Sequence, residues 1–116
     1  MLGSKVQSLP GYLPDLFSEN FIKMNTIKEL IKDPSTIVVD VRSPWEYEKE
    51  HIPGAKNIPL EEINSKVEEF KLYNSPVVLY CRSGNRSSMA VKILQQNEVA
   101  DVYNGGGLSD LQFLLN

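Results

Sequence analysis

The segment that most constrains the fold is residues 77–88, where an apolar run, the only cysteine and a short polar loop precede a helical pattern. Residues 77–80 follow a proline and are β-forming, which is typical of a buried strand in a parallel sheet. Apolar residues then recur at helical spacing, at Met89, Ala90, Ile93 and Leu94. We therefore predict a strand that ends near Cys81 and a helix over residues 87–96.

This order of strand, loop and helix favours an anion-binding loop. The N–H groups at a helix N-terminus and the positive end of the helix dipole would face the inside of the loop. Residues 80–97 include Arg82, Arg86 and Lys92 but no acidic residue, although the formal net charge of the whole chain is −3. Such surroundings lower the pKa of a cysteine from about 8.5 towards neutrality and favour the nucleophilic thiolate. We predict that Cys81 is a reactive nucleophile.

Helical and strand patterns alternate along the rest of the chain. Capping-box patterns at residues 26–29 and 43–46 predict helices over residues 26–32 and 44–49. The spacing of apolar and turn-forming residues predicts further helices over residues 60–70 and from residue 108, with strands over 37–41, 55–58 and 99–103. This alternation indicates an α/β fold, with one mainly parallel central sheet and helices on both faces. Ligands of such sheets bind at the carboxyl ends of the strands, where Cys81 would lie.

Length and composition exclude several classes of protein. A chain of 116 residues forms one domain, which we place at residues 24–116. Residues 1–23, interrupted by Gly and Pro, are interpreted as an N-terminal extension: a tag, a remnant or a short arm. No basic block favours nucleic acid, no apolar run approaches the roughly 18 residues of a membrane span, and the N-terminus does not resemble a signal peptide. We expect a cytoplasmic protein, unless an export signal has been removed.

The cysteine count restricts the chemistry further. One cysteine excludes an intramolecular disulfide, a zinc cluster built from cysteines and a dithiol redox cycle. We expect neither a metal nor an organic cofactor.

Three stretches of the chain resemble the rhodanese family of single-domain sulfurtransferases. The loop that begins at Cys81 is similar to the family's Cys-x-x-Gly-x-[Arg/Ser/Thr] loop. Residues 37–59, which include the run His-Ile-Pro-Gly-Ala, are similar to its N-terminal signature, and residues 103–108 to its C-terminal glycine turn. The three stretches occur in the expected order and extend the resemblance over about residues 25–115.

Two features depart from the family pattern. Glu50 stands where relatives usually have the glycine that precedes the His-Ile-Pro-Gly-Ala run. The aromatic residue that often follows the glycine turn is absent, which leaves Leu108 and Leu111. Both departures lie outside the Cys81 loop and therefore bear on substrate docking more than on the core chemistry.

The resemblance implies a sulfurtransferase that carries a persulfide on Cys81. Sulfur would come from thiosulfate or a persulfide donor and pass to a thiol or to cyanide. The anionic substrate would lie in the loop, against Arg82, Ser83, Gly84, Asn85, Arg86 and Ser87. Arg42 is a candidate second contact for the anion. Structural roles are expected for Asp40, His51 and Gly106, and Trp45 and Tyr47 are expected to pack against the core.

Two alternative functions use the same loop. A persulfide carrier or docking module would exchange sulfur with partner proteins of a sulfur relay through the same Cys81 persulfide. A phosphatase would bind phosphate in a similar loop, but relatives that act on phosphate or arsenate have one more residue between the cysteine and the arginine. Four residues separate Cys81 from Arg86, which favours sulfur chemistry over phosphate chemistry. The loop length does not distinguish a free enzyme from a persulfide carrier.

Overall fold

The computed structural model describes residues 18–116 and, within its first helix, the side chains from residue 26 onward. In chain order the elements are α2 (Glu19–Lys32), β1 (Ile37–Asp40), α3 (Pro44–Lys49), β2 (Lys56–Asn57), α4 (Leu60–Ile63), η1 (Asn64–Lys66), α5 (Val67–Lys71), β3 (Val77–Cys81), α6 (Asn85–Gln96), β4 (Val102–Gly107) and α7 (Leu108–Leu115). Most of the predicted extension lies outside the described residues, so its boundary at residue 24 stays a prediction. No described helix has the length and apolar character needed to cross a membrane.

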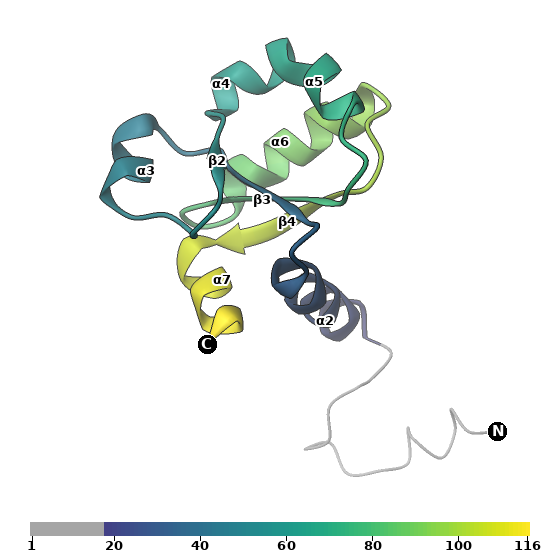
Figure 1. Cartoon of the computed structure of the whole chain (residues 1–116). Coiled ribbons are helices and arrows are strands. Elements are labelled where there is room, and N and C mark those ends of the chain that lie inside the picture. The colour runs from purple at the N-terminus through teal and green to yellow at the C-terminus, as the bar shows by residue number, and fades with distance from the viewer. Residues whose placement is uncertain (1–17) are drawn as a thin grey trace, which may run out of the picture.

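The four strands form one parallel sheet in the order β2-β1-β3-β4, which confirms the predicted α/β class. The order places β3 in the interior of the sheet, where its five residues are all buried. A strand buried on both faces is expected to be continuously apolar, as residues 77–80 are. Figure 1 shows α3 beyond the carboxyl ends of the strands, on the side where β3 ends at Cys81.

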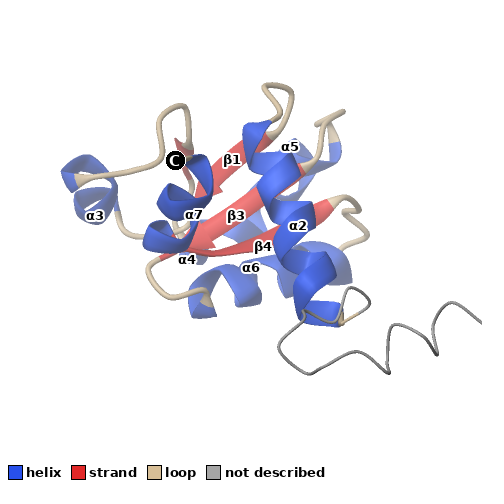
Figure 2. Ribbon diagram, turned by 90° about the horizontal axis from the view of Figure 1, so that it is seen from below, coloured by secondary structure: helices blue, strands red, loops and turns tan. Residues whose placement is uncertain are grey.

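Side chains of β3 alternate between two hydrophobic clusters, one on each face of the sheet. Val77, Leu79 and Cys81 belong to the cluster that includes buried residues of α4, α5 and α6. Val78 and Tyr80 belong to the cluster formed with α2 and α7. Figure 2 shows α2 and α7 over one face of the sheet and α6 behind the other. The strand ends between two packed helical layers, and Cys81 faces the layer that contains α6.

Two of the predicted helices differ from the structure in their extent. Helix α2 begins at Glu19, before the capping-box pattern at residues 26–29. The predicted helix over residues 60–70 is divided into α4, η1 and α5. The Ser65 hydroxyl in η1 donates a hydrogen bond of 2.8 Å to the carbonyl of Glu62, and short polar side chains of this kind compete with the regular helical pattern.

The predicted last strand begins three residues before the observed one. The observed strand runs over Val102–Gly107 rather than residues 99–103, because Asp101 has a left-handed φ of 63° that turns the chain before the strand. The resemblance to the family implies a glycine turn within residues 103–108, and glycine is depleted in strands. In the structure these glycines are in β4, where a Cβ on Gly105 would lie 2.7 Å from a methyl carbon of Val78. The absence of side chains therefore allows β4 to approach β3 closely.

Candidate active site

Cys81 lies at the end of β3 and is 1% exposed. The chain then passes through residues 82–84 and enters α6 at Asn85, two residues before the predicted start. The N–H of Gly84 donates a hydrogen bond of 3.0 Å to the Cys81 Sγ, and the hydroxyl oxygen of Ser87 lies 3.5 Å from the same sulfur. The sulfur is therefore surrounded by polar groups of the loop and of the first turn of α6.

These groups change the acidity of the Cys81 thiol. Burial raises its pKa, but hydrogen bonds from the Ser87 hydroxyl and from the N–H groups of Ser87, Ser83 and Gly84 lower it by more. The net result is a pKa below that of an ordinary thiol. The loop thus favours the thiolate, which is the nucleophilic form.

We expect the pH profile of Cys81 alkylation to show this shift. The rate constant for reaction with iodoacetamide should rise through an inflection at lower pH in the folded protein than in the same protein unfolded in urea, because the hydrogen bonds to the sulfur exist only in the folded state. Measuring the rates from pH 5 to pH 10 would test this. An inflection at or above that of the unfolded chain would show that burial outweighs the hydrogen bonds.

Ser87 is positioned by Asn104, a residue of β4 that is not among the predicted site residues. The buried Ser87 hydroxyl oxygen lies 2.7 Å from the Asn104 Oδ1 and can donate its one hydrogen either to this oxygen or to the Cys81 sulfur. The Asn104 Oδ1 also accepts a hydrogen bond of 2.9 Å from the N–H of Gly106. The Asn104 amide nitrogen lies 3.2 Å from the carbonyl oxygen of Gly84 and donates to it. Asn104 thus links the Cys81 loop to the glycine segment. The only feature of the sequence that could indicate this role is the position of Asn104 directly before three glycines.

The guanidinium of Arg86 forms a two-point ion pair with Glu46 of α3. Its two terminal nitrogens lie 2.9 Å and 3.2 Å from the carboxylate oxygens. The same carboxylate accepts hydrogen bonds from the backbone N–H and the hydroxyl of Ser43, in the predicted capping box. Arg86 lowers the pKa of Glu46 to about 2, so the carboxylate stays ionised at neutral pH. The predicted anion contact is therefore already bonded to a carboxylate.

Arg42 is buried and bonded to Asp40. Its Nε and one terminal nitrogen contact both carboxylate oxygens, with a shortest distance of 2.7 Å, and the same terminal nitrogen donates to the carbonyl of Glu50. The Asp40 carboxylate also accepts from the backbone N–H of Arg42. These contacts fix the turn between β1 and α3 and leave only part of the Arg42 guanidinium facing the surface near the loop.

The remaining predicted residues occupy the rim of the site. The side chains of Arg82, Ser83 and Asn85 are exposed, so these residues present mainly their backbone to the interior of the loop. His51 bonds to the carbonyl of Tyr47 and stacks on its ring, with 3.7 Å between the ring centroids. The position of His51 before Pro53 and Gly54 predicts a structural role in this turn, and both contacts are made to Tyr47, four residues earlier.

One expected core residue lies on the surface. The side chain of Trp45 is 65% exposed, so the prediction that it packs against the core is wrong. Its neighbour Tyr47 is half-buried and donates a hydrogen bond to the carbonyl of Ala55. The two aromatic residues are two positions apart on α3, and positions i and i+2 of a helix face different directions. Gly106, with a left-handed φ of 84°, lies in the glycine segment on the other side of the loop.

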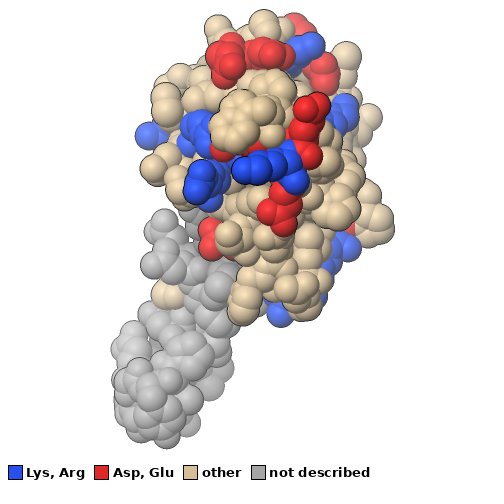
Figure 3. Space-filling view, turned by 90° about the vertical axis from the view of Figure 1, so that its left-hand side faces the viewer, with Lys and Arg blue, Asp and Glu red and all other residues tan. Residues whose placement is uncertain are grey.

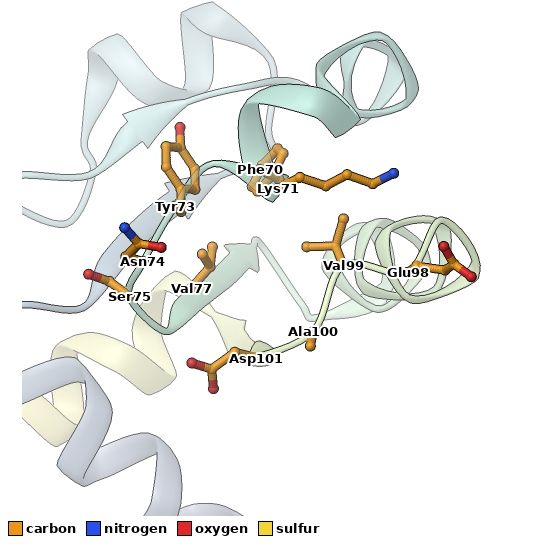
Figure 4. A pocket seen from close by; sticks show the side chains of 10 residues that line it. All are labelled: Phe70, Lys71, Tyr73, Asn74, Ser75, Val77, Glu98, Val99, Ala100 and Asp101. Atoms are coloured by element: carbon orange, nitrogen blue, oxygen red, sulfur yellow. The ribbon is translucent and has the colours of Figure 1, made fainter.

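A hollow lies at the amino end of β3, at the opposite end of the sheet from Cys81. It encloses about 290 Å³. Figure 4 shows the side chains that surround it, from α5, the start of β3 and the segment before β4: Phe70, Lys71, Tyr73, Asn74, Ser75, Val77, Glu98, Val99, Ala100 and Asp101.

In the described part of the chain, no three His, Cys, Asp or Glu side chains are placed to hold a metal ion.

Comparisons with known proteins agree with this geometry. The model of the rhodanese-like domain matches residues 23–111. The thiosulfate sulfurtransferase PspE of Escherichia coli is 39% identical over 74 residues, which are 63% of this chain and 71% of PspE. The putative sulfur carrier protein YrkF of Bacillus subtilis is 36% identical over 84 residues, 72% of this chain and 45% of YrkF. This chain thus spans less than half the length of YrkF.

Solved structures show the same fold. An E. coli rhodanese with anions is 38% identical and superposes with a TM-score of 0.60, covering 65% of this chain and 89% of that protein. A rhodanese-like domain protein of Staphylococcus aureus is 29% identical, with a TM-score of 0.63 over 76% of this chain and 86% of that protein. Together with the matched domain, these likenesses show that the chain belongs to the rhodanese-like family, which its three motifs predict.

Proposed function

We propose that the chain is a thiosulfate sulfurtransferase that acts through a persulfide on Cys81. The thiolate attacks the outer sulfur of thiosulfate, the S–S bond of thiosulfate breaks, and its electron pair leaves with sulfite. The persulfide then gives its outer sulfur to an attacking thiolate or cyanide, and Cys81 departs as the thiolate. Each step exchanges one S–S or S–C bond for another, so no external oxidant or reductant is needed.

The observation that carries this proposal is the set of hydrogen-bond donors directed at the Cys81 sulfur. Gly84 donates to Sγ at 3.0 Å, and the pKa of the thiol is lowered by N–H groups of the loop. Preorganised N–H groups stabilise negative charge without the need to reorient during the reaction. The same donors can stabilise the thiolate, the terminal sulfur of the persulfide and the departing anion.

Kinetics with thiosulfate and cyanide test the proposal. Because the sulfur is held on the protein between two half-reactions, double-reciprocal plots at several fixed concentrations of one substrate should give parallel lines. No hydrolysis of p-nitrophenyl phosphate is expected, since the loop is one residue shorter than that of relatives that act on phosphate. Intersecting lines would contradict the persulfide mechanism, and phosphate hydrolysis without thiocyanate formation would favour the phosphatase.

Arg86→Ala is expected to raise the KM for thiosulfate by about tenfold. The substitution removes a cation and leaves the carboxylate of Glu46 unpaired beside the loop, where it repels the substrate. The double variant Glu46→Gln/Arg86→Ala removes that repulsion and should recover part of the loss. Lys92→Ala removes an exposed cation of the same helix and should change KM by less than about twofold. An unchanged KM in Arg86→Ala would remove this residue from anion binding.

A carrier role is the second candidate, because YrkF is named a putative sulfur carrier protein. A carrier would form the same persulfide but transfer it to a partner protein faster than to cyanide. Comparing the discharge of the loaded protein by cyanide and by protein thiols would separate the two roles. In either role the proposed ligands are a sulfur donor and a sulfur acceptor, with no nucleic acid or membrane involved.

A further inference from the structure

An open groove borders the Cys81 loop along α3. It encloses about 600 Å³ between α3, the residue after Cys81 and the start of α7, and its lining includes Trp45, Lys49, Glu50, Arg82 and Leu108. Glu50 and Leu108, which depart from the rhodanese pattern, therefore both line this groove. Pockets of this size hold organic ligands or stretches of polypeptide, whereas a small inorganic anion would fill only a fraction of the space.

The groove presents unpaired positive charge on an otherwise acidic chain. The neighbouring Arg42 and Arg86 are each paired with a carboxylate. The carboxylate of Glu50 accepts a hydrogen bond from the neutral amide of Gln112 and keeps its negative charge, so the lining, with three basic and two acidic side chains, has one net positive charge. The side chains of Lys49 and Arg82, both in the groove, form no ion pair or hydrogen bond with any other described residue. Figure 3 shows Lys and Arg side chains gathered across the middle of this face. The unpaired cations favour a negatively charged ligand.

One large apolar side chain is exposed in the groove, and a second is exposed on α6, outside the lining of the groove. Trp45 lines the groove and is 65% exposed. Met89 is 56% exposed and lies three residues after Arg86 on α6, so the two share one helix face. Tryptophan, methionine and arginine are enriched in protein interfaces, where their apolar surface is covered by the partner. A small molecule bound in the loop would leave most of this surface in water.

We infer that the groove binds an acidic, extended segment of a partner protein whose cysteine accepts sulfur from Cys81. Trp45 and Leu108 pack against apolar atoms of the segment, and Lys49 and Arg82 bind its carboxylates. The transfer step rests on the proposed function: the partner thiolate attacks the outer sulfur of the persulfide, the S–S bond breaks, and Cys81 leaves as the thiolate. Binding of the segment needs no sulfur chemistry and can be measured separately.

Electrostatics also give the partner an orientation. The chain has a formal net charge of −3, so its surface as a whole repels an acidic partner. Lys49 and Arg82 bring two unpaired cations together in the groove that borders the reactive cysteine, so an acidic partner is attracted locally at this face. An acidic segment would be directed to the groove with its thiol near the loop.

Trp45 provides a direct test because it is the only tryptophan of the chain. Its fluorescence reports binding in the groove of the 116-residue chain. The probes are two short synthetic peptides of equal length and equal apolar content, one rich in Asp and Glu and one rich in Lys, each with serine in place of the reactive cysteine. At low ionic strength we expect saturable binding of the acidic peptide that is at least about tenfold tighter than that of the basic peptide and that weakens as salt is added.

Two variants of equal charge change locate the site. Lys49→Glu should weaken binding of the acidic peptide by about fivefold, whereas Lys28→Glu on α2 should change it by less than about twofold. Equal binding of the two peptides, or equal losses in the two variants, would overturn the inference. Mercaptosuccinate, a small dianionic thiol, would overturn the assignment to a polypeptide if it bound as tightly as the acidic peptide.

A separate assay distinguishes failure of this inference from failure of the proposed function. Thiocyanate formation from thiosulfate and cyanide does not need the groove, so it should change by less than about twofold in Lys49→Glu. Thiocyanate formation without selective binding of the acidic peptide would reject the inferred role of the groove and leave the proposed sulfurtransferase activity supported. Selective binding without thiocyanate formation would keep the groove and reject thiosulfate as the donor.

Discussion

The Cys81→Ser variant is expected to gain no sulfur from thiosulfate and to lose more than about a thousandfold in thiocyanate formation. A serine hydroxyl at this position can accept the hydrogen bond from Gly84 and face Ser87 as the thiol does. It does not ionise near neutral pH, so no comparable nucleophile forms. The loss would therefore come from the missing thiolate, while the loop remains in place.

Two further measurements make this result interpretable. The urea midpoint of Cys81→Ser should stay close to that of the wild type, because the substituted atom is small and keeps its hydrogen-bond donor. Ser87→Ala, which keeps the nucleophile but removes a hydrogen bond that lowers its pKa, should lose only about tenfold. Residual thiocyanate formation in Cys81→Ser at the level of Ser87→Ala would contradict the assignment of Cys81 as the nucleophile.

Gly107→Ala is expected to give the second-largest effect, with a loss of about 2–4 kcal/mol of unfolding free energy and most of the activity. A Cβ at this position would lie far inside van der Waals contact with the carbonyl oxygen of Arg82, the residue after Cys81. The φ of Gly107 is −98°, which alanine adopts freely, so the cost comes from the contact alone. Relief of the clash requires movement of the backbone of the Cys81 loop.

Gly54→Ala is the matched comparison. Gly54 has a left-handed φ of 86°, but a Cβ there would meet open space. The substitution should cost about 1 kcal/mol of backbone strain and leave thiocyanate formation close to wild type. Urea unfolding and activity assays of both variants test the prediction. An active Gly107→Ala protein with a wild-type urea midpoint would show that the close approach of the glycine segment to the loop is not required.

The central part of the fold could be predicted because its signals are local. The apolar run at residues 77–80 and the helical spacing after Ser87 place Cys81 between a strand and a helix without knowledge of any distant contact. The capping box at Ser43 also forms as predicted. Alternation of strands and helices was enough to predict a parallel sheet with its ligand site at the carboxyl ends of the strands.

Features that depend on distant partners could not be predicted. Glu46 and Arg86 are 40 positions apart. The sequence predicts a helix cap for Glu46 and an anion contact for Arg86, and neither pattern indicates that the two side chains pair with each other. Asn104 contacts the loop only because three glycines let β4 approach β3, whereas glycine by itself indicates a turn. Trp45 was expected in the core because aromatic residues are usually buried there, and its exposure depends on how α3 packs.

Intact-protein mass spectrometry of the reduced protein, before and after thiosulfate, tests the central claim most directly. The proposed mechanism predicts a gain in mass of one sulfur atom on the wild-type protein, located at Cys81, and its complete removal by cyanide with release of thiocyanate. Aryl phosphate should add no mass. An unchanged mass after thiosulfate, under conditions in which Cys81 still reacts with iodoacetamide, would contradict the account of this loop as a thiosulfate-dependent sulfur-transfer site.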